Sequence, residues 1–294
     1  MHIDPQCVPC LLKRVLFEAD LTNATDKQKT NAIQAACTIL ATTYHPTGCS
    51  ATIATHVHHA VYQALGTPDP YHDLKQRSTH EATTLAPTVE QLITTSTNRL
   101  KTSLLCAVIG NTLDFGIEGV DTTPEMLATN FQRLIHEGFG YDDTPTLTHR
   151  LASTRHLVFL TDNCGEHVFD RILCRELKHA YPKLSITLVV KGQPILSDAT
   201  LQDANAMDFA GVVDTITTTE AFAVGIPLPP PPRLAHILQD ADLIIAKGMA
   251  NYESLSELTI GPVAYLMRTK CRPIAASLGL PVNINALKVI QSPL

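Results

Sequence analysis

The amino-acid sequence predicts an α/β protein in which a mostly parallel sheet carries helices on both faces and an all-helical segment precedes the sheet. Up to about residue 100, apolar residues recur at the three- and four-residue spacing of amphipathic helices. Beyond about residue 150, short aliphatic runs alternate with helical stretches, as in buried parallel strands. The 294 residues, 45% of them hydrophobic, suffice for a large core. We expect a helical subdomain over residues 1–100 and an α/β domain over residues 101–294.

The N-terminal segment shows helical spacing over residues 10–21, 29–44 and 51–66. Breakers follow the second and third stretches, HPTGCS at 45–50 and GTPDPY at 66–71, and the latter contains two prolines that cannot continue a helix. The third stretch carries His56, His58 and His59 without the i, i+4 partners that would complete a ligand set. We expect these histidines on a helix surface.

The C-terminal part contains three aliphatic runs typical of buried strands, HLVFLTDN at 156–163, SITLVVKG at 185–192 and ADLIIAKG at 241–248. The stretch EHVFDRILCRELKHAY between the first two has helical spacing. Residues 104–116, LLCAVIGNTLDFG, suit a buried strand or a buried helix, and we favour a helix. The proline run at 226–232 indicates an extended loop.

Charge and composition exclude several classes of protein. The chain has 28 acidic and 22 basic residues, a net charge of -6 and no Lys/Arg tract, so the electrostatic signature of a nucleic-acid partner is missing. The N-terminus has neither a basic start nor an apolar signal core, and no apolar run approaches the roughly 20 residues that span a bilayer. We therefore expect a soluble cytosolic protein without membrane partners.

The eight cysteines are scattered through a mid-sized chain, which predicts reduced thiols rather than a disulfide framework. Cys7 and Cys10 form a C-x-x-C, which is compatible with a redox pair, half of a zinc site or two buried thiols in a helix. A second C-x-x-C is absent, so a zinc ribbon is disfavoured. Cys271 is the one candidate for a third partner.

Polar residues follow each of the three predicted strands. In open α/β sheets the ligand site lies beyond the carboxyl ends of the strands, so these residues are expected at one rim. They are Asp162, Asn163, Gly165 and Glu166 after the first strand, Asp198 after the second, and Lys247, Gly248, Asn251 and Glu253 after the third.

Two interpretations of this rim are physically sound. Asn163 and Glu166 fit a variant of the capping box at a helix start. Alternatively, Asp162, Asn163 and Asp198 offer carboxylate and amide oxygens that suit a divalent ion such as Mg²⁺ or Mn²⁺. Such an ion, with Lys247 and a helix N-terminus nearby, could neutralise and orient a phosphate ester and make water more acidic.

Other nucleophile schemes lack their signatures. Cys164 at a helix N-terminus could be a low-pKa nucleophile, but a C-x5-R loop would require arginine where Asp170 stands. A D-x-D motif is absent because Cys164 stands two places after Asp162. The dinucleotide, P-loop, zincin and serine-hydrolase motifs are also missing.

Six motifs occur along the chain in the order CVPC, DPYHDLK, GNTLDFG, LTDNCGEHVFDR, KGQPILSDAT and KGMANYESL. This order resembles the DUF89 family, the damage-control phosphatases, and in particular its archaeal-type branch with an N-terminal C-x-x-C. The resemblance spans nearly the whole chain and implies a metal-dependent phosphatase with a helical N-terminal part and a Rossmann-like α/β part.

The resemblance also implies roles for individual residues. Asp162, Asn163 and Asp198 would hold the divalent ion, Lys247 would meet the substrate phosphate, and Glu166 would activate or orient the attacking water. The residues Asn111, Asp114, Gly165, Asn251 and Glu253 would complete the substrate pocket. Cys164 stands where alanine is expected and would make the site sensitive to oxidation, and Ser197 stands where asparagine is expected and would loosen Asp198. Asp69, Tyr71 and Lys75 match a family segment, although a turn before a solvated helix would look the same.

These residues lead to the hypothesis of a cytosolic phosphatase that uses Mn²⁺, Mg²⁺, Co²⁺ or Ni²⁺ and acts on small phosphorylated metabolites, such as sugar phosphates or damaged phosphometabolites. Two rivals are a non-catalytic protein that binds a metal or phosphorylated ligand, and a redox or zinc protein centred on Cys7 and Cys10. Residue types leave open whether water or Asp162 is the nucleophile, which substrate and metal are native, and which oligomeric state forms.

Overall fold

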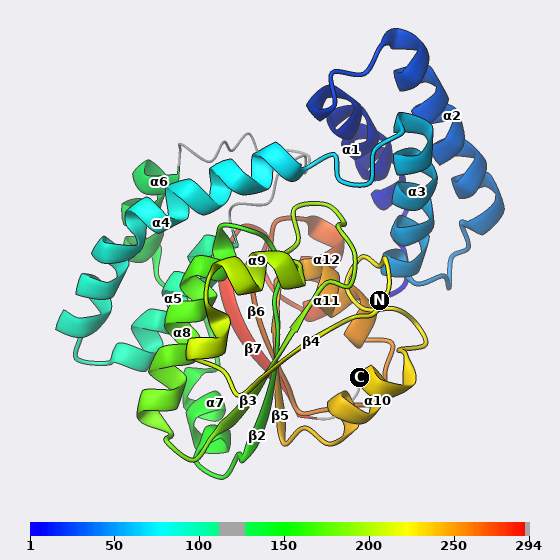
Figure 1. Ribbon diagram of the computed structural model, residues 1–294. Helices are drawn as coiled ribbons and strands as arrows, with labels where there is room; N and C mark the ends of the chain where they lie inside the picture. Colours follow the sequence, from blue (N-terminus) through cyan, green and yellow to red (C-terminus); the bar gives the residue numbers. More distant parts are fainter. Residues whose placement is uncertain (112–126, 292–294) are drawn as a thin grey trace.

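Figure 1 shows the computed structural model, which describes residues 1–111 and 127–291. Within these residues, seven strands form one sheet in the order β1-β7-β6-β5-β2-β3-β4. The strands are β1 (Tyr141–Asp142), β2 (His156–Leu160), β3 (Ser185–Val190), β4 (Thr215–Thr218), β5 (Leu243–Lys247), β6 (Val263–Arg268) and β7 (Asn285–Ile290). Neighbouring strands are parallel except for β6 and β7. The predicted mostly parallel sheet is thus confirmed.

Helices cover both faces of the sheet. They are α5 (Arg99–Gly110), α6 (Leu127–Glu137), α7 (Thr144–Leu151), α8 (Glu166–Ala180), α9 (Leu201–Ala206), α10 (Pro232–Gln239), α11 (Gly248–Leu255) and α12 (Arg272–Leu278). In β2, Leu157 and Phe159 pack in one core with α5, α7 and α8, while Val158 and Leu160 pack in another with α10, α11 and α12. Burial on both faces explains why the strand reads as a continuous apolar run.

The N-terminal region is helical, as the spacing predicted. It consists of α1 (Cys7–Leu21), α2 (Asp26–Thr43), α3 (Ser50–Leu65) and α4 (His72–Thr95). In Figure 1, α1, α2 and α3 group together beside the sheet, and α4 runs from this group toward α5, α6 and α8. The interpretation of 104–116 as a helix is confirmed as far as Gly110, and residues 112–116 lie outside the described part.

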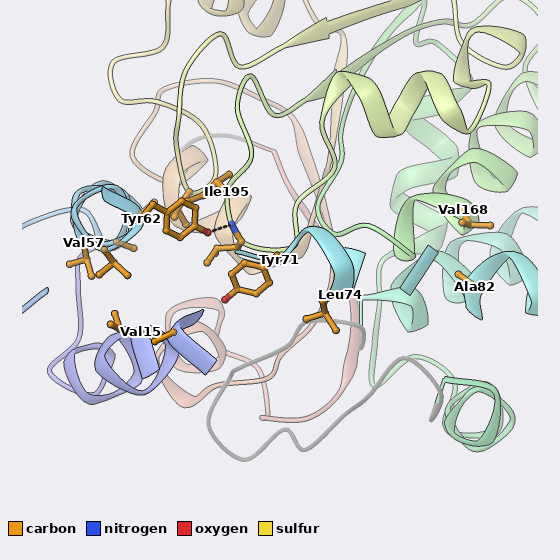
Figure 2. Packing of buried hydrophobic residues seen from close by; sticks show 14 of the residues in the cluster. Val15, Val57, Tyr62, Tyr71, Leu74, Ala82, Val168 and Ile195 are labelled. Carbon is orange, nitrogen blue, oxygen red and sulfur yellow. Dashed lines mark hydrogen bonds between the residues drawn. The ribbon is translucent and has the colours of Figure 1, made fainter. Parts of the chain in front are cut away.

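The N-terminal helices share a core with the α/β part. Val15 and Val57 of the helical group belong to the same cluster of buried side chains as Val168 of α8 and Ile195 of the loop after β3 (Figure 2). This packing places the helical group beside the loop between β3 and α9, which is the loop that carries Asp198.

Among the residues that the structure describes, no helix combines the length and the apolar character required to cross a membrane.

Candidate functional site

The carboxyl end of β2 lies where the chain reverses its direction of travel across the sheet. From β2 the chain continues to β3 and β4 on one side, and later returns to β5 and β6 on the other side. Such a switch point opens a crevice at the carboxyl ends of the strands. The residues that follow β2, β3 and β5 therefore meet at this point.

The structure brings Asp162, Asn163 and Asp198 together at this crevice. Asn163 and Asp198 face each other in an isolated antiparallel bridge, and the backbone N–H of Ala199 donates to the carbonyl oxygen of Asp162 at 2.8 Å. All three side chains line a cavity of about 320 Å³. They are only 4%, 2% and 3% exposed, respectively. Two carboxylates and one amide thus converge in a largely dehydrated space although 36 positions separate the outer two.

Hydrogen bonds fix the orientation of the Asn163 amide. Its Nδ2 donates to Asp162 Oδ2 at 2.7 Å and to Glu166 Oε2 at 3.1 Å. Asn111 supports the same two acids from behind, since its Nδ2 donates to Asp162 Oδ2 at 2.8 Å and to Glu166 Oε2 at 2.9 Å. On the other side of the Asn163 amide, Oδ1 accepts a hydrogen bond from Ser197 Oγ at 2.6 Å. The amide nitrogen is therefore committed to the acids, and the oxygen is the atom left for a ligand.

Gly248, the first residue of α11, packs directly against the Asp162 carboxylate. Its φ of 74° lies in the left-handed region, and an added Cβ would overlap the Asp162 carboxyl group. Only glycine permits this conformation and this approach without strain.

Lys247 and Glu166 lie behind the cavity wall rather than in it. Lys247 Nζ donates to Glu166 Oε1 and to Asp170 Oδ1, both at 2.5 Å, and to the carbonyl oxygen of Ala107 at 3.0 Å. All three charged side chains are fully buried, and neither Lys247 nor Glu166 lines the cavity. In this arrangement neither Lys247 nor Glu166 faces the space in which a phosphate or an attacking water would lie. Their positions suit support of Asn163 and Asn111 instead.

The pKa values of Asp170 and Lys247 follow from their burial and from the charges they place next to each other. Burial raises the pKa of Asp170 to about 7, although the charge of Lys247 opposes the rise. Burial alone would lower the pKa of Lys247, but the Asp170 and Glu166 carboxylates outweigh it and hold that pKa above the usual value. Lys247 therefore stays charged, and Asp170 is the group that changes its protonation near neutral pH.

Of the other candidate site residues, some line the cavity and others stabilise the elements around it. Glu253 lines the cavity. Asn251 is buried beside it, and its Nδ2 donates to the carbonyl oxygens of Thr161 and Lys247 at 2.9 and 2.7 Å, which ties α11 to the ends of β2 and β5. Asp114 lies outside the described residues.

Of the two interpretations of the rim, the capping box of Asn163 and Glu166 at α8 is wrong. The helix starts at Glu166, the residue before it is Gly165 with a φ of 85°, and no side chain caps this end. Gly165 donates its backbone N–H to His167 Nδ1 at 3.0 Å. Asn163 lies too early in the chain to cap α8, so its amide oxygen is not engaged by the N-terminus of this helix.

Four cations at the site were not anticipated from the sequence. Arg14, Lys270 and Arg272 line the cavity, and Lys191 Nζ lies 3.2 Å from Asp198 Oδ2. Lys191 and Lys270 closely follow β3 and β6 in the chain. Because ligand sites in such sheets lie beyond the carboxyl ends of the strands, both lysines could have been predicted from the sequence. Arg14 and Arg272 belong to α1 and α12, and no local pattern in the sequence points to them.

Comparison with known proteins assigns the chain to a family. A family model described as "Damage-control phosphatase ARMT1-like domain" matches residues 3–284. The crystal structure of a DUF89 family protein from Pyrococcus horikoshii has the same fold, with a TM-score of 0.87 and 24% identity over 99% of each chain. A damage-control phosphatase of Archaeoglobus fulgidus is 36% identical over 292 residues, which cover 99% of this chain and 100% of that protein. The chain belongs to the DUF89 family of damage-control phosphatases.

The Pyrococcus horikoshii protein of this crystal structure is itself named a damage-control phosphatase. Its sequence is 26% identical over 282 residues, which cover 96% of each protein. The family resemblance carried by the six sequence motifs is therefore confirmed.

The cysteines of this DUF89 protein do not form a metal centre of their own. All eight lie within the described residues and none is in a disulfide. Cys7, Cys10 and Cys271 line the cavity, and burial raises the pKa of Cys7 to about 12. Across residues 1–111 and 127–291, no three His, Cys, Asp or Glu side chains cluster closely enough to hold a metal by themselves. These observations disfavour a zinc site, and they disfavour a reactive thiolate at Cys7.

Two residues that depart from the expected DUF89 pattern have clear surroundings. Cys164 is fully buried, and burial raises its pKa well above the usual value, so the expected sensitivity to oxidation does not fit its position. Ser197 holds the Asn163 amide oxygen through the hydrogen bond described above.

The DPYHDLK segment has a structural role. Lys75 Nζ lies 2.7 Å from Asp69 Oδ2, and the backbone N–H of Tyr71 donates to Asp69 Oδ1 at 3.2 Å. None of the three side chains lines the cavity. Of the histidines expected on a helix surface, His56 and His59 are exposed, but for His58 the expectation is wrong because it is buried and lines the cavity.

Proposed function

We propose that this protein is a divalent-metal-dependent phosphatase that hydrolyses small phosphorylated metabolites, such as sugar phosphates or damaged phosphometabolites. The observation that carries the proposal is the convergence of Asp162, Asn163 and Asp198 in one cavity that also presents Lys270 and Arg14. The cavity, about 320 Å³, is at the lower end of the usual range for small-molecule sites. The names of the relatives support the phosphatase class.

The donor set fits a hard or borderline divalent ion. The ion would bind to the Asp162 and Asp198 carboxylates and to Asn163 Oδ1, with the remaining positions taken by water or substrate oxygens, which is the ligand chemistry of Mg²⁺ and Mn²⁺ and is open to Co²⁺ and Ni²⁺. Two buried carboxylates in one cavity repel each other, and a bound cation would offset this repulsion, as Lys191 does for Asp198 at 3.2 Å. A bound divalent ion supplies Lewis acidity and makes water a stronger nucleophile near neutral pH.

The chain's own groups would bind and orient the substrate. Lys270, Arg14 and Arg272 line the cavity, and their positive charge would attract the phosphate group of a substrate. Asn111 and Glu166 hold the Asp162 carboxylate and the Asn163 amide in place through hydrogen bonds.

We propose water as the nucleophile because Asp162 Oδ2 already accepts two hydrogen bonds. Direct attack by water inverts the configuration at a chiral phosphorus, whereas an aspartyl intermediate involves two inversions and gives net retention. Hydrolysis of a substrate with an isotopically chiral phosphate distinguishes the two, and retention would contradict attack by water.

Release of inorganic phosphate from a panel of sugar phosphates, measured with Mn²⁺, Co²⁺, Ni²⁺ and Mg²⁺ in turn, tests the proposal. Asp162→Asn should abolish turnover, because it removes a ligand charge without changing the side-chain volume. Asp240→Asn is the matched control, since Asp240 is exposed at the end of α10. Equal activity of the two variants would exclude Asp162 from the catalytic centre.

The same panel separates the rival functions. Ligand binding without turnover under every metal would favour a non-catalytic binding protein. Replacing both Cys7 and Cys10 by serine should preserve metal-dependent turnover, and its loss would favour a centre built on these thiols.

A further inference from the structure

A histidine–glutamate pair from the N-terminal helices forms part of the cavity wall. His58 of α3 and Glu18 of α1 are 1% and 0% exposed, and His58 Nδ1 lies 2.8 Å from Glu18 Oε1. His58 lines the same cavity as Asp162, Asn163 and Asp198, whereas Glu18 lies behind it. The imidazole ring of His58, with a buried carboxylate beside it, therefore borders the space in which the substrate phosphate would bind.

The surroundings of the pair fix the orientation of the ring. Glu18 Oε1 lies 2.8 Å from Nδ1, so this edge of the ring faces the carboxylate. Tyr71 donates its hydroxyl to the same Glu18 Oε1 at 3.3 Å, and the Tyr62 ring meets the His58 ring edge-on at 6.4 Å between centroids. Nε2 is consequently the ring nitrogen that is left for a group in the cavity. A carboxylate behind an imidazole holds the ring in position, as in catalytic triads.

We propose that His58 is the general acid that protonates the leaving oxygen of the substrate, with Glu18 as its positioning residue. The proposal rests on the proposed phosphatase function. As water adds to phosphorus, the bond between phosphorus and the ester oxygen breaks, and its electron pair stays on that oxygen. The oxygen takes the proton from His58 Nε2 and leaves as an alcohol. The proton that the attacking water releases goes to solvent, and Nε2 regains a proton from solvent before the next turnover.

A purely structural role for the pair predicts a different outcome. If the pair only ties α1 to α3, its loss would loosen the cavity and slow every substrate to a similar extent. A general acid matters only where the leaving group is a poor one, because an alkoxide requires a proton whereas nitrophenolate does not. The dependence of the rate on the leaving group therefore separates the two roles.

The test compares an alkyl phosphate with p-nitrophenyl phosphate in the same metal-loaded enzyme. His58→Asn places an amide nitrogen near Nδ1, which keeps a donor for Glu18, and removes Nε2. The kcat for the alkyl phosphate should fall by roughly 10²–10⁴-fold, the usual contribution of general acid catalysis, while the kcat for p-nitrophenyl phosphate changes little. His56→Asn on the exposed side of α3 is the matched control and should leave both rates unchanged.

Glu18→Gln gives an independent measurement that does not depend on the folding of the His58 variant. It keeps the size of the side chain and removes the charge, so it should slow the alkyl phosphate selectively and by less than His58→Asn does. Equal losses on both substrates, or no loss on either, would overturn the general-acid proposal. Wild-type enzyme that hydrolyses neither substrate with any of the metals would instead overturn the phosphatase function itself.

Discussion

Replacement of Gly248 by alanine should strongly reduce turnover while reducing the free energy of unfolding only modestly. Gly248 has a φ of 74°, and an added Cβ would lie 2.8 Å from Asp162 Oδ1 and closer still to the carboxyl carbon and Oδ2. Left-handed backbone costs a non-glycine residue roughly 1–2 kcal/mol. The overlap must also displace the Asp162 carboxylate by on the order of 1 Å, and a misplacement of that size can cost about 10²-fold in rate.

Gly138→Ala is the control for Gly248→Ala, because the two variants share the strain but not the overlap. Gly138 has a φ of 65°, and no atom lies within 4 Å of its added Cβ. Urea unfolding should therefore show similar losses of stability, of roughly 1–2 kcal/mol. Turnover and metal affinity, the latter measured by calorimetric titration, should fall only in Gly248→Ala. Wild-type turnover in Gly248→Ala, or an equal loss in Gly138→Ala, would refute the assigned contact.

Three further predictions concern the groups that support the cavity. Lys247→Met leaves the Glu166 and Asp170 carboxylates buried without their shared cation, so urea unfolding should show a loss of about 3–5 kcal/mol; a loss below 1 kcal/mol would exclude that role. The pKa of Asp170 is raised from 3.8 to about 7 in the folded state. Between these pH values the folded protein holds a proton on Asp170 that the unfolded chain has lost. The contribution of Asp170 to stability therefore declines as the pH rises from about 4 to 7. Asp170→Asn should remove this decline in unfolding measurements at several pH values, and an unchanged slope would contradict the assignment. Ser197→Ala removes the hydrogen bond to Asn163 Oδ1 and should weaken Mn²⁺ binding by about 1 kcal/mol in a calorimetric titration, whereas tighter binding would show that the hydroxyl competes with the ion.

The central strands could be predicted from the sequence because their environment leaves a strong pattern. β2, β3 and β5 are covered on both faces, and most of their side chains are aliphatic or aromatic. β4 is a short edge strand with three threonines, and β7 pairs antiparallel with β6. Such strands lack a long apolar run, so they were not anticipated. The division at residue 100 likewise ignores the buried cluster that joins the N-terminal helices to α8, since contacts between distant segments leave no local signal.

The proposed ligand residues could be predicted from their places after the strands, whereas the position of Lys247 depends on the face of the strand on which its side chain lies. Side chains alternate along a strand, and in β5 Ile245 packs toward α5 and α8 whereas Ile244 packs toward α11. Lys247 is two positions after Ile245, so it shares that face and reaches the carbonyl oxygen of Ala107 in α5. Alternation thus accounts for its burial away from the cavity. His58 and Arg14 enter the site through the packing of α1 and α3, which no residue pattern specifies.

The hydrogen bond between Leu196 and Tyr62 makes the N-terminal helices part of the support for the proposed metal site. Leu196 has a φ of 48°, and its backbone N–H donates to the Tyr62 hydroxyl at 2.9 Å, two residues before Asp198. A strained residue of this kind keeps its conformation only while its surroundings hold it. A truncated chain that starts at residue 101 would lack the Tyr62 hydroxyl, and the backbone of the segment that carries Asp198 would change its conformation. Affinity for the ion and integrity of the helical group should therefore be lost together, and the α/β half alone would be a scaffold without its function.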